Sequence, residues 1–312
     1  MSFSLSDINA RAKTDPRGFI DSCDADYAKK ISTAADKITA NIKNSPIVLL
    51  SGPSGSGKTT TSKKLKEELE RRGIRSHAIS LDNYFRSRDS YIVPKAPDGS
   101  LDFESPDCVD MDLLSEHFDM LNRGERVFLP TFDFSRQMRI MEPSNSLKLH
   151  SDEIAVFEGI HALNTRITAQ HPEAFKLYIS ARSNVEDAGA VVFKGTWMRL
   201  VRRTVRDHLF RGADASKTLD MWANVRRGEK RYISPFKDQA DLQFDSSFAY
   251  EVSVLNNMAC ALFDSIPEGV ERYQELRQIR PACEHFVDID PDLLRPDSLL
   301  REFVGGGIYD GE

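Results

Sequence analysis

The chain has 312 residues and a formal net charge of −6, with 48 acidic against 42 basic side chains. This acidic balance disfavours a general nucleic-acid binder, and the length suffices for one large domain or two small ones. No apolar run approaches the roughly 20 residues that cross a bilayer, and the N-terminus lacks the apolar core of a secretory signal. Four scattered cysteines form no CxxC pair, so we expect no zinc site, no disulfide framework and a cytoplasmic location.

The spacing of apolar residues predicts alternating helices and strands in the first part of the chain. Small and apolar residues at helical spacing predict an amphipathic helix over 24–43. The run 46–52 is apolar on both faces, as central parallel strands are, and a helix over 57–72 follows it. A second strand over 74–82 leads into a polar loop over 83–110, and loops of that length inside compact domains are typically functional.

The second part of the chain continues the pattern. In chain order we expect a helix over 110–124, a strand or hairpin arm over 126–134, strands over 153–159 and 174–180, and helices over 196–210 and 215–231. From residue 256 the tail is expected to be mostly helical. There Asp297 is expected to cap a helix N-terminus, and Gly305 is expected to end that helix.

Residues 52–59, GPSGSGKT, match G-x-x-x-x-G-K-[ST] between a predicted strand and a predicted helix. Glycines let such a backbone curl so that its N–H groups point inward, and the helix N-terminus adds partial positive charge. Lys58 is expected to reach the β- and γ-phosphates, and the Thr59 hydroxyl to bind Mg²⁺. The ATP-binding residues expected in this loop are Gly52, Ser54, Gly55, Ser56, Gly57, Lys58, Thr59 and Thr60. The motif does not say what receives the γ-phosphate.

Two carboxylates follow predicted strands at the edge of the sheet where ligands of doubly wound folds bind. Asp82, in SLDNYF, is a candidate for taking the proton of an attacking hydroxyl or for holding the metal through a water. A helix cap or a loop aspartate is the plainer alternative. Glu158 closes the apolar run IAVFE and is a candidate metal contact, because the phosphate loop requires a metal partner.

A basic segment lies on an otherwise acidic chain. Residues 194–231 hold eleven Lys or Arg against four Asp or Glu. An apolar stripe recurs every four residues, at Trp197, Val201, Val205 and Leu209. Five arginines lie off it, at positions 199, 202, 203, 206 and 211. A solvated helix face is the plainer alternative, but beside an ATP site we favour a lid around 196–214 whose guanidinium groups meet phosphate oxygens.

Six motifs occur in the order found in one kinase family. They are GPSGSGKTT, SLDNYF, FESPDCVD, LPTFDF, FEGIHAL and RLVRRTVRDHLFRG. Over about residues 46–250 the chain resembles the phosphoribulokinase/uridine kinase group, and its PDSLLREFVGG resembles a bacterial branch of uridine or nucleoside kinases. The resemblance implies transfer of the ATP γ-phosphate to a hydroxyl of a small molecule, commonly the 5′-hydroxyl of uridine or cytidine.

The resemblance also implies roles for individual positions. The catalytic residues expected are Asp82, Lys58 and Arg206. The metal positions expected are Thr59, Glu158 and Asp82, and the lid residues expected to meet ATP are Arg203 and Arg211. The residues expected at the acceptor are Tyr84, Asp107, Phe132, Gln137, Arg203 and Arg206.

Four positions depart from the family pattern on the acceptor side. Phe132 stands where a tyrosine is expected, Gln137 replaces a histidine, Ala213 an arginine and Met221 a glutamine. Loss of a polar group that reads a substrate can cost orders of magnitude in discrimination. A kinase of the same fold for a sugar phosphate or another hydroxylated metabolite is therefore the main alternative. A nucleotide switch or an ATPase is the other, although N-K-x-D and LSGGQ-like motifs are absent from the sequence.

Together these patterns predict a three-layer α/β P-loop kinase fold with a mostly parallel sheet. We expect an N-terminal helical extension over 1–45, a kinase domain over 46–255 and a C-terminal helical segment over 256–312 packed on that domain. The expected partners are ATP, Mg²⁺ and a small-molecule acceptor, without nucleic acid or membrane. The sequence leaves open the acceptor, the choice of ATP or GTP, and whether the chain forms a homo-oligomer.

Overall fold

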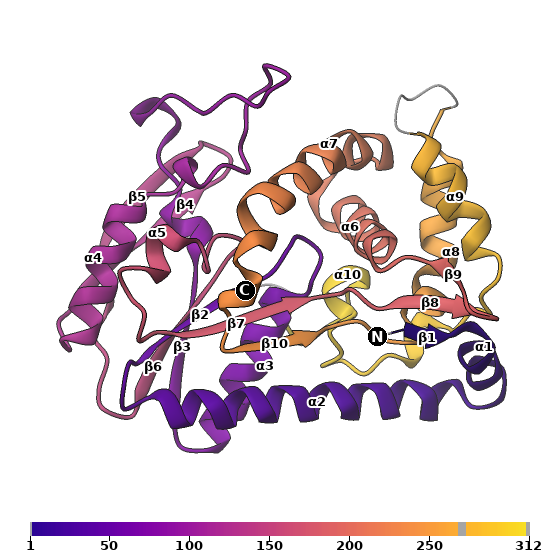
Figure 1. Cartoon of the computed structure of the whole chain (residues 1–312), viewed down its shortest axis with the longest axis horizontal. Helices are drawn as coiled ribbons and strands as arrows, with labels where there is room; N and C mark the ends of the chain where they lie inside the picture. The colour runs from indigo at the N-terminus through magenta and orange to yellow at the C-terminus, as the bar shows by residue number, and fades with distance from the viewer. Residues whose placement is uncertain (1, 268–272, 310–312) are drawn as a thin grey trace.

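A five-stranded parallel sheet forms the centre of the computed structural model, which describes residues 2–267 and 273–309 (Figure 1). The strand order is β10-β7-β2-β6-β3, and every neighbouring pair is parallel. These strands are β2 (Ile47–Ser51), β3 (Arg75–Ser80), β6 (Glu153–Glu158), β7 (Phe175–Ser180) and β10 (Leu242–Asp245). The first four confirm the predicted strands. The sequence pattern misses β10, whose four residues are too few to show a period.

Helices cover both faces of the sheet, which confirms the three-layer fold. The described α-helices are α1 (Leu5–Thr14), α2 (Pro16–Asn41), α3 (Lys58–Arg71), α4 (Met111–Asn122), α5 (Thr165–Thr168), α6 (Gly195–Arg211), α7 (Ala215–Gly228), α8 (Glu251–Asp264), α9 (Tyr273–Cys283) and α10 (Arg301–Val304). Successive residues of β2 alternate between two cores. Val48 and Leu50 join the core that contains α2, α3, α6 and α8, whereas Ile47 and Leu49 join the core that contains α4.

The N-terminal extension holds more structure than the predicted helix over 24–43. Helix α2 begins at Pro16, because the Asp15 side chain caps it by accepting from the Gly18 N–H and proline suits the first helical position. Figure 1 shows α2 running below the sheet across most of the width of the molecule. Ahead of it, β1 (Ser2–Ser4) pairs in parallel with β8 (Asn184–Asp187), which also pairs with β9 (Ala190–Phe193). The pattern misses these three short strands.

The predicted loop over 83–110 and the hairpin that follows form one wall of the molecule. The loop holds short 3₁₀ turns at Leu81–Tyr84, Arg88–Ser90 and Pro106–Cys108. Strand β4 (Val127–Asp133) pairs antiparallel with β5 (Met138–Leu147), so the predicted hairpin arm over 126–134 is confirmed.

The tail is helical only in part. Helix α8 runs across residue 255, the predicted end of the kinase domain. A largely irregular stretch separates α9 from α10. The predicted capping role of Asp297 is wrong. Helix α10 begins at Arg301 with Leu300 at the cap position, and the Asp297 carboxylate instead pairs with Lys64 at 2.9 Å. The predicted end at Gly305 is confirmed, with a φ of 82° that suits glycine.

The last turn of the chain is part of the core. Leu299, Leu300 and Phe303 are each 0% exposed and belong to the same apolar cluster as α3 and α6. The Arg202 guanidinium lies over the Phe303 ring, 5.1 Å from its centroid. No described helix has the length and apolar character of a membrane span.

Replacing Phe303 tests whether this turn contributes to the core. Phe303→Ala is expected to lower the free energy of unfolding by about 3–5 kcal/mol, because it leaves a cavity at a fully buried site. Urea denaturation followed by circular dichroism measures the change. Ile308→Ala is the matched control, since Ile308 lies on the same segment but is 61% exposed, and a change within about 0.5 kcal/mol is expected there. Equal stability of Phe303→Ala and the wild type would contradict a contribution of this turn to the core.

Candidate active site

The phosphate loop connects β2 to α3, as its motif requires. Gly55 and Gly57 adopt φ values of 76° and 79°, which side chains rarely allow. Gly52 is needed for a different reason. A Cβ there would stand 2.1 Å from the Ile179 carbonyl oxygen of the neighbouring strand. The Lys58 ammonium donates to the Pro53 carbonyl across the loop at 3.3 Å.

Three arginines of helix α6 donate hydrogen bonds to this loop. Arg199 donates to the Ser54 carbonyl at 3.2 Å, Arg202 to the Gly55 carbonyl at 3.1 Å, and Arg203 to the Ser54 hydroxyl at 2.8 Å. All three are less than 10% exposed. The sequence pattern predicts that these arginines form a guanidinium face. That face is instead packed on the loop itself, because α6 lies directly against Gly55.

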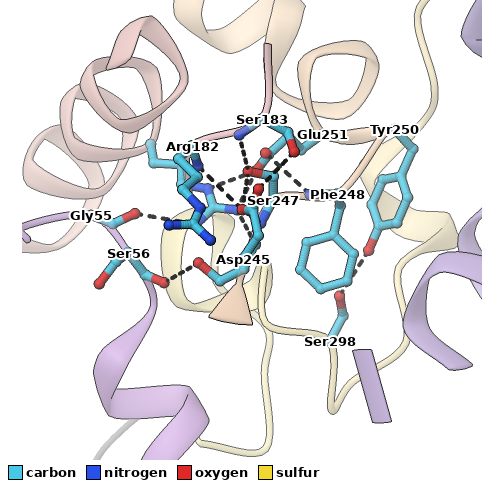
Figure 2. Close-up of polar contacts among 12 residues, drawn as sticks. Gly55, Ser56, Arg182, Ser183, Asp245, Ser247, Phe248, Tyr250, Glu251 and Ser298 are labelled. Atoms are coloured by element: carbon cyan, nitrogen blue, oxygen red, sulfur yellow. Dashed lines mark hydrogen bonds and ion pairs between the residues drawn. The ribbon is translucent and has the colours of Figure 1, made fainter. Parts of the chain in front are cut away.

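Arg202 is part of a buried polar network that includes Gly55, Ser56 and Glu251, which are labelled in Figure 2. The Arg202 Nε donates to a Glu251 carboxylate oxygen at 2.6 Å, and its Nη2 donates to the Ser246 carbonyl at 2.9 Å. The Ser246 hydroxyl in turn donates to the Ser56 carbonyl at 2.7 Å. A buried charge is tolerated when it is paired and its donors are used, as they are here. The network therefore ties the loop to α6 and to the start of α8.

The Asp207 carboxylate pairs with the lid arginines, a role that the sequence pattern does not predict. Asp207 is 4% exposed and accepts from Arg206 through Nε at 3.0 Å and Nη2 at 2.7 Å. Arg203 lies 3.2 Å and Arg211 3.6 Å from its carboxylate. The available signal is its position four residues after Arg203, a spacing at which helical side chains meet. One carboxylate thus holds together the three arginines expected in the lid.

Lys58, Asp82 and Glu158 lie close enough to change one another's ionisation. Burial lowers the pKa of Lys58, and the carboxylates of Glu158 and Asp82 oppose that effect. Asp82 is open to solvent, yet the surrounding protein raises the pKa of its carboxyl, with Lys58 and Arg211 acting in the other direction. Burial raises the pKa of Glu158 to about 7, with Lys58 lowering it and Asp82 raising it further. The structure therefore brings the three predicted residues together.

These groups fit a magnesium ion held jointly with phosphates. Burial raises the pKa of Glu158, repulsion by Asp82 raises it further, and a cation would relieve that repulsion. Thr59 is exposed at the start of α3, as a hydroxyl ligand must be. Among the described residues no group of three or more His, Cys, Asp or Glu side chains forms a metal site. Mg²⁺ commonly takes one or two protein carboxylates and completes its shell with substrate phosphates and water.

An aromatic pocket of about 250 Å³ lies between the polar loop and the β4–β5 hairpin. It is lined by Phe85, Arg86, Arg88, Tyr91, Phe103, Cys108, Phe132, Phe134 and Gln137. The Phe132 ring lies 5.6 Å from that of Phe85 and 5.1 Å from that of Phe134. The Asn83 amide oxygen accepts from the Phe132 N–H at 3.3 Å, so the hairpin is fastened beside Asp82. Two predicted acceptor residues, Phe132 and Gln137, therefore share this pocket.

Of the other four predicted acceptor residues, Arg203 and Arg206 lie on α6, and Tyr84 and Asp107 lie elsewhere. Tyr84 is 0% exposed, and its hydroxyl hydrogen-bonds to His117 Nδ1 at 2.9 Å inside the core. Asp107 pairs with Arg166 at 2.6 Å near the surface. Glu104, from the same FESPDCVD motif, lies against Gly228 of α7. Burial raises its pKa to about 7, and the charges acting on it include those of Arg203, Lys58 and Asp82.

Residues 47–253 match the family model described as phosphoribulokinase / uridine kinase family. The chain belongs to that family. It is 25% identical over 215 residues to a uridine kinase of Staphylococcus haemolyticus, covering 68% of this chain and 92% of the relative. It is 28% identical over 197 residues to a uridine kinase of Borreliella burgdorferi, covering 63% of this chain and 84% of the relative.

A solved structure shows the same fold. It is that of a proposed fructose transport system kinase from Silicibacter sp. TM1040, with a TM-score of 0.52 and 20% identity over 69% of this chain and 98% of that one. As a family member, the chain is a P-loop kinase, a phosphotransferase that uses ATP and a hydroxyl acceptor on a small molecule. Residues before 47 and after 253 lie outside the family match.

The role of Asp207 can be tested by removing its charge. Asp207→Asn is expected to lower kcat/KM by about 10- to 100-fold, because hydrogen bonds to charged groups contribute about 1.5–3 kcal/mol and three guanidinium groups lose their common partner. Steady-state assays of ADP release measure the change. His208→Asn, at the next and exposed position of the same helix, should leave kcat/KM within twofold. Equal losses in both variants would mean general damage to the helix.

Proposed function

We propose that this kinase transfers the γ-phosphate of ATP to a hydroxyl of a nucleoside, with the 5′-hydroxyl of uridine or cytidine as the first candidate. One observation carries this proposal. The charge of Lys58 in the phosphate loop acts on Asp82, and the next residue, Asn83, bonds the backbone of Phe132 in the aromatic pocket. Aromatic faces suit a planar base, and a carboxylate beside the pocket suits the hydroxyl of a bound sugar. The names of the two relatives support the same acceptor class.

In the proposed reaction Asp82 is the general base. The acceptor oxygen attacks the γ-phosphorus, the bond from that phosphorus to the bridging β-oxygen breaks, and the acceptor proton passes to the Asp82 carboxylate. The raised pKa of Asp82 makes it a stronger base than an ordinary aspartate. Lys58 and the loop amides hold the phosphates. Arg203, Arg206 and Arg211 offset the charge that develops on the transferred group.

Thr59, Glu158 and Asp82 are the residues that would hold Mg²⁺. When bound, the ion would neutralise the phosphate oxygens. The lid would exclude water around the phosphates, because Arg203 packs on the loop and Asp207 holds Arg206 and Arg211 beside it. Exclusion of water distinguishes transfer to an acceptor from hydrolysis of ATP.

A phosphorylated acceptor, such as a sugar phosphate, is the second candidate. Arg86 and Arg88 line the aromatic pocket, and a neutral nucleoside would not need two cations there. Arg86 is already paired with Asp110 at 3.3 Å, which leaves Arg88 as the stronger candidate for an anionic group. This observation, together with the departures at Ala213 and Met221, keeps the acceptor class open to experiment.

The acceptor is tested by incubating the protein with Mg-ATP and a panel of nucleosides, sugar phosphates and polyols while ADP is measured. Uridine- or cytidine-dependent release is expected to fall by about 10²- to 10⁴-fold in Asp82→Asn, the usual contribution of a general base. ADP binding should survive, which shows that the variant is folded. Release that ignores every acceptor, or an Asp82→Asn variant of full activity, would refute the proposal.

Glu104 and Asp107 can be compared directly as acceptor residues. Glu104→Gln is expected to raise the acceptor KM about tenfold with little change in ADP affinity, because the charges of Arg203, Lys58 and Asp82 act on Glu104 whereas Asp107 is held by Arg166. Asp89→Asn, an exposed acid of the same loop, is the control. A larger rise of the acceptor KM in Asp107→Asn than in Glu104→Gln would instead support Asp107 as the acceptor residue, as predicted from the sequence.

A further inference from the structure

The end of the chain is packed against the phosphate loop and its helix. We call residues 294–309 the C-terminal segment. It is fastened to α3 at two points, since Asp297 pairs with Lys64 at 2.9 Å and Lys63 donates to the Tyr309 carbonyl at 3.0 Å. In Figure 1 helix α10 lies between α6 and α3. Methyl and methine carbons of Leu299 lie 2.6–3.0 Å from where a Cβ on Gly57 would stand.

Glu302 of this segment occupies donors of the phosphate loop. One of its carboxylate oxygens accepts from the Thr60 N–H at 3.2 Å and from the Thr60 hydroxyl at 2.7 Å. Thr60 is the third residue of α3, so its N–H has no partner inside the helix. N–H groups at this point of a phosphate loop are the ones that cradle the α- and β-phosphates of a nucleotide. A carboxylate therefore lies where an anionic ligand is expected.

The charge of Glu302 also reaches the rest of the site. Burial lowers the pKa of Lys58, and the Glu302 carboxylate opposes that effect together with Glu158 and Asp82. Burial raises the pKa of Glu158, and Asp82 and then Glu302 raise it further. A nucleotide would add further negative charge at the same place. A phosphate and this carboxylate would repel each other, and they would compete for the same two donors.

We propose that Glu302 is a built-in competitor of the nucleotide, which must displace it from Thr60 in order to bind. The C-terminal segment then lowers the affinity for ATP and ADP and couples nucleotide binding to the position of the segment. Since Glu302 lies beyond the family match over 47–253, this device is an addition to the family's domain. The inference rests on the nucleotide site of the proposed function but not on the identity of the acceptor.

A different role for Glu302 makes the opposite prediction. In this alternative Glu302 has a purely structural role as a helix cap, because the cap residue of α3, Gly57, offers no side chain. In that case its removal would destabilise α3 and leave nucleotide affinity equal or weaker. Under the competitor role, its removal strengthens binding. A contact that is formed nine-tenths of the time raises the apparent Kd about tenfold.

The test is calorimetric titration of the full chain without Mg²⁺ or acceptor, using ADP and, separately, inorganic tripolyphosphate. Glu302→Gln and Glu302→Ala are expected to bind both ligands about three- to tenfold more tightly than the wild type, with the larger gain for alanine, which offers no acceptor. Tripolyphosphate tests the phosphate site without a base. Asp292→Asn is the matched control, because it removes one exposed negative charge just before the C-terminal segment. Its affinities should equal those of the wild type.

Thermal unfolding identifies which variants are folded, and either Glu302 variant suffices for the test. Equal or weaker affinity of a folded Glu302 variant would overturn the inference and leave the nucleotide site intact. A similar gain in Asp292→Asn would also overturn it, because general charge would then explain the effect. If the wild type and all variants fail to bind ADP, the proposed nucleotide site is refuted and this inference falls with it.

Discussion

The phosphate loop depends on Arg202, the most deeply buried of the three arginines of α6 that bind it. This side chain is 0% exposed and donates in three directions, to the Glu251 carboxylate, the Ser246 carbonyl and the Gly55 carbonyl. A buried guanidinium is costly unless its donors are satisfied, so the elements around it are constrained to supply acceptors. The carbonyl side of the loop is thereby fixed to α6 and to the turn before α8. An ordered loop binds phosphate without first paying for its own ordering.

Opposite charges are sorted onto two sides of the loop. The carboxylates of Asp82 and Glu158 gather at the carboxyl ends of β3 and β6, where their repulsion contributes to the raised pKa of Glu158. The lid arginines lie on α6, and the Asp207 carboxylate reduces their mutual repulsion by pairing with all three. A triphosphate with its cation would complete this arrangement, because it supplies positive charge on the first side and negative charge on the second.

The N-terminal extension and the C-terminal segment both contact the first turn of α3. From the N-terminal extension, the Tyr27 hydroxyl hydrogen-bonds to the Thr61 hydroxyl at 2.6 Å. From the C-terminal segment, the Glu302 carboxylate accepts from Thr60. These contacts lie one residue apart, directly after Lys58 and Thr59. The additions to the family's domain are therefore built into its nucleotide side rather than attached at a distance.

The sequence by itself determined the fold class, the family and the phosphate-loop motif, and it predicts Lys58, Asp82 and Glu158 as site residues, because these depend on local patterns and on strand ends that meet at one edge of a sheet. It could not show that Asp107 pairs with Arg166 whereas Glu104 lies against Gly228, since both lie in one irregular loop whose path is set by contacts with distant elements. Tertiary structure also decided that Arg199 and Arg202 face the loop, and it alone brought Glu302 to Thr60. Contacts between residues so far apart in the chain leave no periodic signal, because they arise only when packing brings the two surfaces together.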